Sequence, residues 1–265
     1  MIKQQNNVLW HKTNAMMRFA LVKGAANPFA KNVLVNEFPK SGASWSAQML
    51  SDTLDLPFPR NRLPMLRSSI LHGHYITKTN IAKTLIVWRD GRDVAVSWFY
   101  HLVVGHEQTN DRARQLVRRE AGITDPKNLE ESFPLALEYF LKQPRYPGYS
   151  WVDFVNRWAD NDDVVHVKYE DLKVDASREL KRITYELTGT DLPDIRSNKI
   201  VEKYSFQKQS GRLPGNANTN KYLRKGIVGD WKNHFNEKSR SVFADLAGDQ
   251  LIKLGYETNK NWAKE

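Results

Sequence analysis

The chain has 265 residues, of which 40% are hydrophobic and 11% aromatic, so it can bury a substantial core and is not a disordered polypeptide. It has no cysteine, which excludes disulfides and thiolate metal ligands and is typical of a reducing compartment. The 40 Lys+Arg against 30 Asp+Glu give a formal net charge of +10, which favours an acidic ligand, although a solvated basic surface explains it equally well. No helix-turn-helix, zinc-finger or RNA-binding motif accompanies this charge, so we expect no nucleic-acid partner.

The first 30 residues are interpreted as an N-terminal extension, without a signal peptide or membrane span. They lack an uninterrupted apolar core, and the stretch 16–23 is too short and too charged to cross a bilayer. A helix packed on the protein body is favoured over a surface-seeking amphipathic helix, which leaves peripheral membrane contact open. We therefore expect a cytoplasmic protein with a single domain over residues 1–265.

In chain order, the hydrophobic pattern predicts three strand-then-helix units. The strands are expected at 32–38, 84–89 and 163–169, and the helices that follow them at 45–55, at 92–101 and along an apolar stripe from Ala176 to Leu187. A short strand is also predicted at 69–74. Alternating strands and helices indicate an α/β fold with a central, mostly parallel sheet flanked by helices.

Four further segments complete the pattern. Helices are predicted near 151–159 and 242–251, where apolar residues recur at helical spacing. The segments 106–148 and 207–222 are predicted to be irregular. Long loops in such domains more often cover binding sites than act as spacers, so we expect 106–150 and 207–222 to cover the substrate.

Residues 38–45, with the sequence Phe-Pro-Lys-Ser-Gly-Ala-Ser-Trp, lie between the first predicted strand and its helix. Backbone N–H groups at a helix N-terminus carry partial positive charge and lack intrahelical partners. Small side chains let a phosphate approach them, and Lys40 adds a mobile charge. The nucleotide P-loop requires Gly-Lys-Ser/Thr at its end, but no glycine in this chain is followed by lysine. The segment is therefore a P-loop-like anion site with its lysine at the front.

Two further segments carry cations suited to an anion. Arg89 at a strand end and Ser97 in the next helix could clamp a second phosphate, although an ion pair between Arg89 and Asp93 is an equal alternative. Arg224 and Lys225 before a glycine suit an anion clasp, but in isolation a basic turn explains them better.

Ligands of open parallel sheets bind beyond the carboxyl ends of the strands. Lys40, Arg89, His72 and His74 all follow or end predicted strands. We therefore expect these four side chains at one edge of the sheet.

Together these segments resemble the sulfotransferases that use 3′-phosphoadenosine 5′-phosphosulfate (PAPS). Residues 39–45 are similar to the family's 5′-phosphosulfate loop, 89–97 to its 3′-phosphate motif, and 224–231 to its C-terminal motif. Residues 169–172 also match a segment that follows a central strand. The similarities occur in the right order over residues 38–235. The resemblance implies a P-loop NTPase-like fold and metal-independent transfer of a sulfuryl group from PAPS to an acceptor hydroxyl.

The resemblance assigns binding roles to the positions that match. Those for the 5′-phosphate are Ser41, Gly42, Ala43, Ser44 and Trp45, with Trp45 also beside the adenine. Those for the 3′-phosphate are Arg89, Ser97, Arg224, Lys225 and Gly226. Tyr169 and Phe206 would border the base. The family's loop commonly has threonines where this chain has Ala43 and Ser44, so backbone donors are expected to do more at position 43.

The resemblance also implies a mechanism, an in-line displacement at sulfur. Lys40 is suited to stabilise the bridging oxygen that leaves with the nucleotide, because negative charge develops there. Ser97 would hold Lys40 aside until the acceptor arrives. A histidine should take the hydroxyl proton, since neutral imidazole is a competent base near physiological pH.

Two histidines compete for the role of base. His72 and His74 face the same way on an extended strand, so periodicity cannot separate them. Placing the family's Lys-Thr-His strand end against residues 71–74 makes His74 the base and His72 the alternative. As a rival interpretation the two imidazoles share a metal ion, but no third ligand stands at a recognisable spacing.

A carbohydrate or glycolipid hydroxyl is the first expectation for the acceptor, and a small phenol or alcohol is the second. The first rests on polar covering segments with aromatic side chains, namely Tyr139, Tyr146, Tyr149 and Trp151. Two other classes of function compete with sulfuryl transfer. One is a nucleotide-dependent phosphotransferase on a related fold, and the other is a non-catalytic protein that binds anions or nucleic acid.

Overall fold

The computed structural model describes residues 8–23, 31–60, 67–107, 109–142 and 144–264. They form two compact units, each built from several stretches of chain. The first unit contains residues up to Glu37 together with Gly42–Trp88 and Asp162–Lys208. The second contains Phe38–Ser41, Arg89–Asn161 and the chain from Gln209 onward. That the whole chain acts as one domain stays a prediction.

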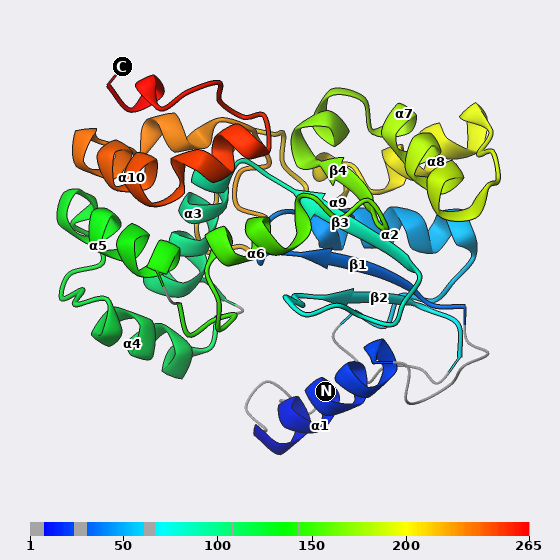
Figure 1. Ribbon diagram of the computed structural model, residues 1–265, viewed down its shortest axis with the longest axis horizontal. Helices are drawn as coiled ribbons and strands as arrows, with labels where there is room; N and C mark the ends of the chain where they lie inside the picture. The colour runs from blue at the N-terminus through cyan, green and yellow to red at the C-terminus, as the bar shows by residue number, and fades with distance from the viewer. Residues whose placement is uncertain (1–7, 24–30, 61–66, 108, 143, 265) are drawn as a thin grey trace. The chain divides into compact units, whose positions relative to one another are not determined.

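A parallel four-stranded sheet forms the centre of the first unit. Its strands are β1 (Val33–Glu37), β2 (Ile70–Gly73), β3 (Lys83–Trp88) and β4 (Val165–Lys168), in the order β2-β1-β3-β4 (Figure 1). The strands are short and mostly apolar, as expected for a parallel sheet covered on both faces. Each overlaps a strand predicted from the sequence, and the predicted α/β class is confirmed.

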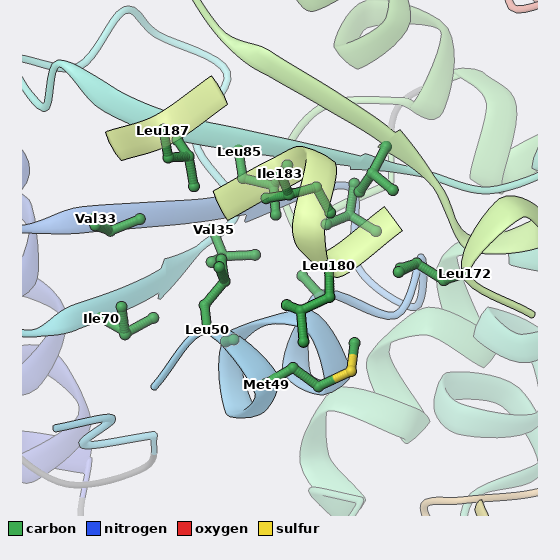
Figure 2. Close-up of a cluster of buried hydrophobic side chains, with 14 of the residues drawn as sticks. Val33, Val35, Met49, Leu50, Ile70, Leu85, Leu172, Leu180, Ile183 and Leu187 are labelled. Carbon is green, nitrogen blue, oxygen red and sulfur yellow. The ribbon is translucent and has the colours of Figure 1, made fainter. Parts of the chain in front are cut away.

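Helices cover both faces of this sheet. On one face, α2 (Ala43–Leu54), α7 (Tyr169–Thr188) and α8 (Asp194–Lys203) bury a cluster that includes Val33, Val35 and Leu85 of the strands (Figure 2). On the other face, Leu34 and Leu71 pack against Leu21 and Val22 of α1 (Val8–Val22). Successive strand residues point to opposite faces, so Val33 and Leu34 enter different clusters.

The apolar stripe predicted between Ala176 and Leu187 is confirmed, because Ala176, Leu180, Ile183 and Leu187 of α7 are all buried. The N-terminal helix packs on the sheet through its last turn, as favoured from the sequence. The remaining residues of the predicted extension, 1–7 and 24–30, lie outside the described residues. In the described part of the chain, no helix combines the length and the apolar character that crossing a membrane requires.

The second unit is helical. Its elements are α3 (Gly91–Phe99), a π-helical turn η2 (Tyr100–Val104), α4 (Asp111–Glu120), α5 (Leu129–Lys142), α6 (Trp151–Trp158), a 3₁₀ turn η3 (Asp230–Asn233), α10 (Glu237–Lys253) and a 3₁₀ turn η4 (Asn261–Lys264). The short helix α9 (Phe206–Ser210) precedes the C-terminal part of this unit in the chain. The helices predicted near 92–101, 151–159 and 242–251 are confirmed.

The prediction of an irregular segment over 106–148 is wrong, because most of it is helical in α4 and α5. The side chain of Asn110 accepts a hydrogen bond from the backbone N–H of Ala113 and so caps α4. The sequence of α4 is polar, and Val117 is its one buried residue. α5 buries Phe133, Leu137 and Phe140 at helical spacing. In 207–222 the start belongs to α9 and the rest contains neither helix nor strand, as predicted.

Candidate functional site

The loop after β1 has two residues in the left-handed region of backbone space. Lys40 has φ 84° and Gly42, the N-cap of α2, has φ 106°. The first is unfavourable for a residue with a side chain, and such strain clusters at functional sites. At Gly42 a Cβ atom would also lie 2.7 Å from the ring of Tyr169. The turn that opens α2 therefore requires glycine at position 42.

Three backbone or side-chain donors of this loop have partners within the chain. The N–H and hydroxyl of Ser41 both donate to the carbonyl of Phe38, at 3.2 and 2.9 Å. The N–H of Ala43 donates to Oε2 of Glu37 at 2.7 Å. The N–H of Ala43, which was expected to donate to the bound anion, therefore donates in this structure to a carboxylate that the sequence analysis did not single out.

Glu37, His72 and His74 form a compact cluster in the first unit. The Glu37 side chain is buried, and its Oε1 lies 3.1 Å from Nε2 of His72. Nδ1 of His74 lies 3.1 Å from the carbonyl oxygen of Glu37. Because a carbonyl only accepts, this Nδ1 carries the proton, and in the neutral ring the lone pair is on Nε2. His74 is exposed and His72 half-buried, so the cluster opens to solvent on the His74 side.

Burial alone would raise the pKa of Glu37, but the hydrogen bond from His72 and the charges of His72 and His74 hold this pKa below its usual value. The carboxylate is therefore ionised at physiological pH. Both histidines predicted as bases thus share one buried acidic partner.

The aromatic residues predicted to border an adenine partly come together. Trp45 of α2 and Tyr169 of α7 stand edge to face, with ring centroids 5.9 Å apart. Phe206 is half-buried at the start of α9.

In the second unit, the ion pair between Arg89 and Asp93 is present, and the phosphate clamp by Arg89 and Ser97 stays a prediction. Its guanidinium lies 3.6 Å from a carboxylate oxygen of Asp93, and it donates to the carbonyl oxygens of Lys40 (3.4 Å) and Ile227 (3.1 Å). Asp93 is fully buried and also accepts from the N–H groups of Gly229 and Trp231, at 2.8 and 2.9 Å. Asp93 therefore ties α3 to the C-terminal segment that carries the other predicted cations.

A second buried carboxylate, Asp230, holds those cations. It lies 2.5 Å from a guanidinium nitrogen of Arg224, 2.6 Å from Nζ of Lys225 and 3.3 Å from Nε2 of His234. Burial alone would raise the pKa of Asp230, but the hydrogen bonds from His234, Lys225 and Arg224 hold it far below its usual value. Arg224 also lies over the ring of Tyr100, 4.7 Å from its centroid. The basic residues 224 and 225 are thus fixed in place, unlike those of a solvated turn.

Lys40 has an aromatic and a histidine neighbourhood within the second unit. Its Nζ lies 4.0 Å from the ring centroid of Tyr222, whose ring stands edge to face with His106. His106 Nε2 lies 2.7 Å from Nδ1 of His101. Burial and the charge of Lys40 lower the pKa of His106 to about 4, so this imidazole is neutral at physiological pH. Ser97 is half-buried on α3, and its expected hold on Lys40 stays a prediction.

Three of the four aromatic side chains expected to meet a carbohydrate have structural partners inside the second unit. Trp151 is buried against Gly91 and Phe243, and Tyr149 packs against Phe38. The Tyr139 hydroxyl donates to Glu120 at 2.7 Å. These contacts leave Tyr146, which is exposed, as the remaining aromatic side chain in the argument for a carbohydrate acceptor.

Sequence reasoning found the cations of the candidate site and offered Asp93 as a partner of Arg89, but it missed two buried acidic residues, Glu37 and Asp230. One signal was available at Glu37, which ends an otherwise apolar buried strand. A carboxylate in such a place needs partners, and two histidines on the neighbouring strand could have been tested as those partners.

Comparison with known proteins identifies the family. The family model "Sulfotransferase domain" matches residues 59–255. The chain is 26% identical to mouse Sulfotransferase 1E1, covering 83% of each chain, and 27% identical to rabbit amine sulfotransferase, covering 86% of this chain and 84% of the relative. The chain therefore belongs to the sulfotransferase family, as the sequence motifs predicted.

Solved structures agree with this assignment. Mouse sulfotransferase SULT7A1, solved in complex with 3′-phosphoadenosine 5′-phosphate (PAP), superposes with a TM-score of 0.61 at 25% identity, over 89% of this chain and 91% of that chain. Retinol dehydratase, solved with retinol and PAP, shares the fold with a TM-score of 0.59 at 17% identity, over 91% of this chain and 86% of that chain. The predicted resemblance to P-loop-like sulfotransferases is confirmed at the level of fold.

Proposed function

We propose that this protein transfers the sulfuryl group of PAPS to an acceptor hydroxyl. The observation that carries the proposal is the family match over 59–255, together with the PAP complex of a structural relative at 25% identity. The Lys-Ser-Gly loop and the Arg224-Lys225-Gly226 segment add the cations and the turn that two phosphate groups require.

The proposed nucleotide-binding residues fall into two groups, one on the loop after β1 and one among the cations of the second unit. Gly42, Ser44 and Trp45, with Lys40 and Ser41 before them, would hold the 5′-phosphosulfate, and Trp45 and Tyr169 would border the adenine, with Phe206 as a further neighbour. Arg89, Ser97 and the segment 224–226 would hold the 3′-phosphate. The buried carboxylates Asp93 and Asp230 support this role, because they fix the cations before any ligand arrives.

His74 is proposed as the general base. Its Nδ1 donates to the carbonyl of Glu37, which leaves the lone pair on Nε2, the nitrogen that would accept the acceptor's proton. The acceptor oxygen then forms its bond to sulfur as the bond from sulfur to the bridging oxygen breaks. Lys40 would stabilise the negative charge on that oxygen, which departs as part of PAP.

A small alcohol or phenol is the acceptor we favour over a carbohydrate or glycolipid. Phe58 stands edge to face with His72, with centroids 6.4 Å apart, and so gives the histidine cluster an apolar neighbour. The aromatic side chains 139, 149 and 151 are engaged in packing or hydrogen bonding, which leaves the carbohydrate alternative without its main support.

The test is an assay for PAP release from PAPS with a panel of phenols, alcohols, steroids, amines and glycans. We expect release that depends on one of the small hydroxyl compounds. Turnover with glycans alone would reverse the order of acceptors. A lack of turnover with every acceptor, combined with no measurable PAP binding, would contradict sulfuryl transfer itself.

A further inference from the structure

The geometry points to a zinc-class metal site made of Glu37, His72 and His74, whose occupation excludes the general-base role of this cluster. Each residue offers one ligand atom, and the three atoms lie within 4.8 Å of one another. Among the described residues, this is the one group of three or more histidine and acidic side chains with ligand atoms that close together.

The ligand set suits Zn²⁺. Two imidazole nitrogens and one carboxylate oxygen are a ligand combination that zinc accepts, with the fourth position left for water or a substrate group. Zinc binds such ligands at about 2.0–2.2 Å, so tetrahedral ligands lie about 3.4 Å apart. His72 Nε2 and Glu37 Oε1 are already 3.1 Å apart. A metal ion between them would need the pair to open by only a few tenths of an ångström and would replace the shared proton.

Rigid backbone holds the ligands at this separation. β1 and β2 are parallel neighbours, and Val35 pairs with His72 and Asn36 with Gly73. The next residues are therefore Glu37, the last of β1, and His74, which directly follows β2, so all three ligands lie at the carboxyl ends of adjacent strands. Glu37 and His72 lie within the strands, where sites are held more precisely than on loops.

Outer hydrogen bonds orient two of the ligands. His74 Nδ1 donates to the carbonyl of Glu37 at 3.1 Å, which leaves Nε2 as the nitrogen that can bind a metal. Oε2 of Glu37 accepts from the N–H of Ala43 at 2.7 Å, while Oε1 faces His72. Metal-bound histidines commonly donate their other ring N–H to a carbonyl, and metal-bound carboxylates are commonly hydrogen-bonded. His74 is exposed, which provides an entry path for the ion.

The consequence for catalysis rests on the proposed function. The lone pair of His74 Nε2 cannot accept a proton from the acceptor while it binds zinc. Zinc would therefore act as an inhibitor that competes with the acceptor's proton for His74, and it would take no part in the transfer itself. Removal of the ion by a chelator should restore turnover.

The binding test is calorimetric titration of the full-length protein with Zn²⁺, supported by the visible absorption spectrum of the Co²⁺ form. We expect one zinc ion per chain and a tetrahedral cobalt spectrum in the wild type. Zinc affinity should fall at least tenfold in H74Q and E37Q. The control is H166Q, since His166 lies on β4 of the same unit, accepts a hydrogen bond from the Trp88 indole at 2.9 Å, and is no member of the cluster.

Equal zinc affinity in the wild type and H74Q would overturn the site. The exposed position of His74 makes this variant suitable even if E37Q, which removes a buried charge, does not fold. PAP release by the wild type should fall as zinc fills the site measured by calorimetry. Turnover that is unaffected when this site is saturated with zinc would contradict the inhibition. If the zinc-free protein releases no PAP, the sulfotransferase proposal fails, and the calorimetric result still decides the metal site.

Discussion

Two regions of the molecule provide anion-binding chemistry in different ways. The turn that opens α2 depends on a helix N-terminus, a required glycine and a cluster of one carboxylate and two imidazoles. The segment 224–231 depends on side-chain cations held by the buried carboxylates Asp93 and Asp230. The first arrangement offers imidazoles that can move a proton, and the second offers fixed cations that can hold a phosphate.

The two regions thus separate the chemical step of the transfer from the binding of the nucleotide. Imidazoles beside an ionised carboxylate remain able to take up a proton. Arginine and lysine held by a buried carboxylate are fixed in position and lose little freedom when a phosphate binds. Changes in the imidazoles of the first region should therefore alter turnover, whereas changes in the cations and carboxylates of the second should alter nucleotide affinity.

The largest expected effect is on turnover when the base is removed. His74→Gln should lower kcat by about 10²–10⁴-fold, because the acceptor hydroxyl loses its proton acceptor. PAP affinity, measured by calorimetry, should stay within threefold of wild type. The matched variant His72→Gln should cost less, and a larger loss in His72→Gln than in His74→Gln would make His72 the base.

The second effect concerns the charge that develops on the leaving oxygen. Lys40→Met should reduce kcat by about 10²–10³-fold, the range found when one stabilising donor of a developing charge is removed. Lys40→Arg, which keeps the charge in another shape, should recover part of this loss. If rapid-quench measurement shows the same rate of the chemical step in Lys40→Met and wild type, Lys40 has no catalytic role.

The third effect separates the regions by affinity. Asp230→Asn leaves Arg224 and Lys225 without their shared carboxylate, so PAP affinity should fall about 10–100-fold while kcat at saturation changes little. Breaking a buried ion pair also costs about 3 kcal/mol of folding free energy, which urea unfolding would detect. The control is Asp245→Asn, an exposed carboxylate on α10. A loss of kcat with unchanged PAP affinity would contradict the division between the regions.

The pH dependence of stability tests the neighbourhood of Lys40. The pKa of His106 is lowered to about 4 in the folded protein, against about 6.5 in an unfolded chain. The unfolded state therefore binds more protons between these values, and stability falls as pH drops from about 6.5 to about 4. His106→Gln should lose less stability over that window, by a few degrees in Tm at pH 4.5. Identical pH profiles of Tm would show that His106 is not held neutral.

The smallest expected effect is at the loop hydroxyl. Ser44→Ala removes one neutral hydrogen-bond donor, so PAP affinity should fall about 2–10-fold. Ser44→Thr keeps the hydroxyl and should retain wild-type affinity. A hundredfold loss in Ser44→Ala would mean that this side chain, more than the backbone, holds the 5′-phosphate.

The strands and most helices were predictable because their apolar residues follow clear periods, as in β1 and α7. α4 was missed because a polar helix with Val117 as its buried residue carries almost no periodic signal. Lys40, Arg89 and the 224–226 segment were found by their place in motifs. Asp230 was overlooked although its partners Arg224, Lys225 and His234 are close to it in sequence. Glu37 was missed because its partner His72 lies 35 residues away, and the contact of Asp93 with Gly229 was missed because 136 residues separate them. Long-range pairing of this kind is determined by the fold and leaves no local pattern.

The most direct test of the account is transfer of labelled sulfate from PAPS to a small phenol or alcohol by wild type, His74→Gln and Asp230→Asn, measured together with PAP affinity. We expect labelled product from the wild type, loss of turnover with intact PAP affinity in His74→Gln, and loss of affinity with intact kcat in Asp230→Asn. Labelled product formed equally well by wild type and His74→Gln would contradict the role of His74 as the base.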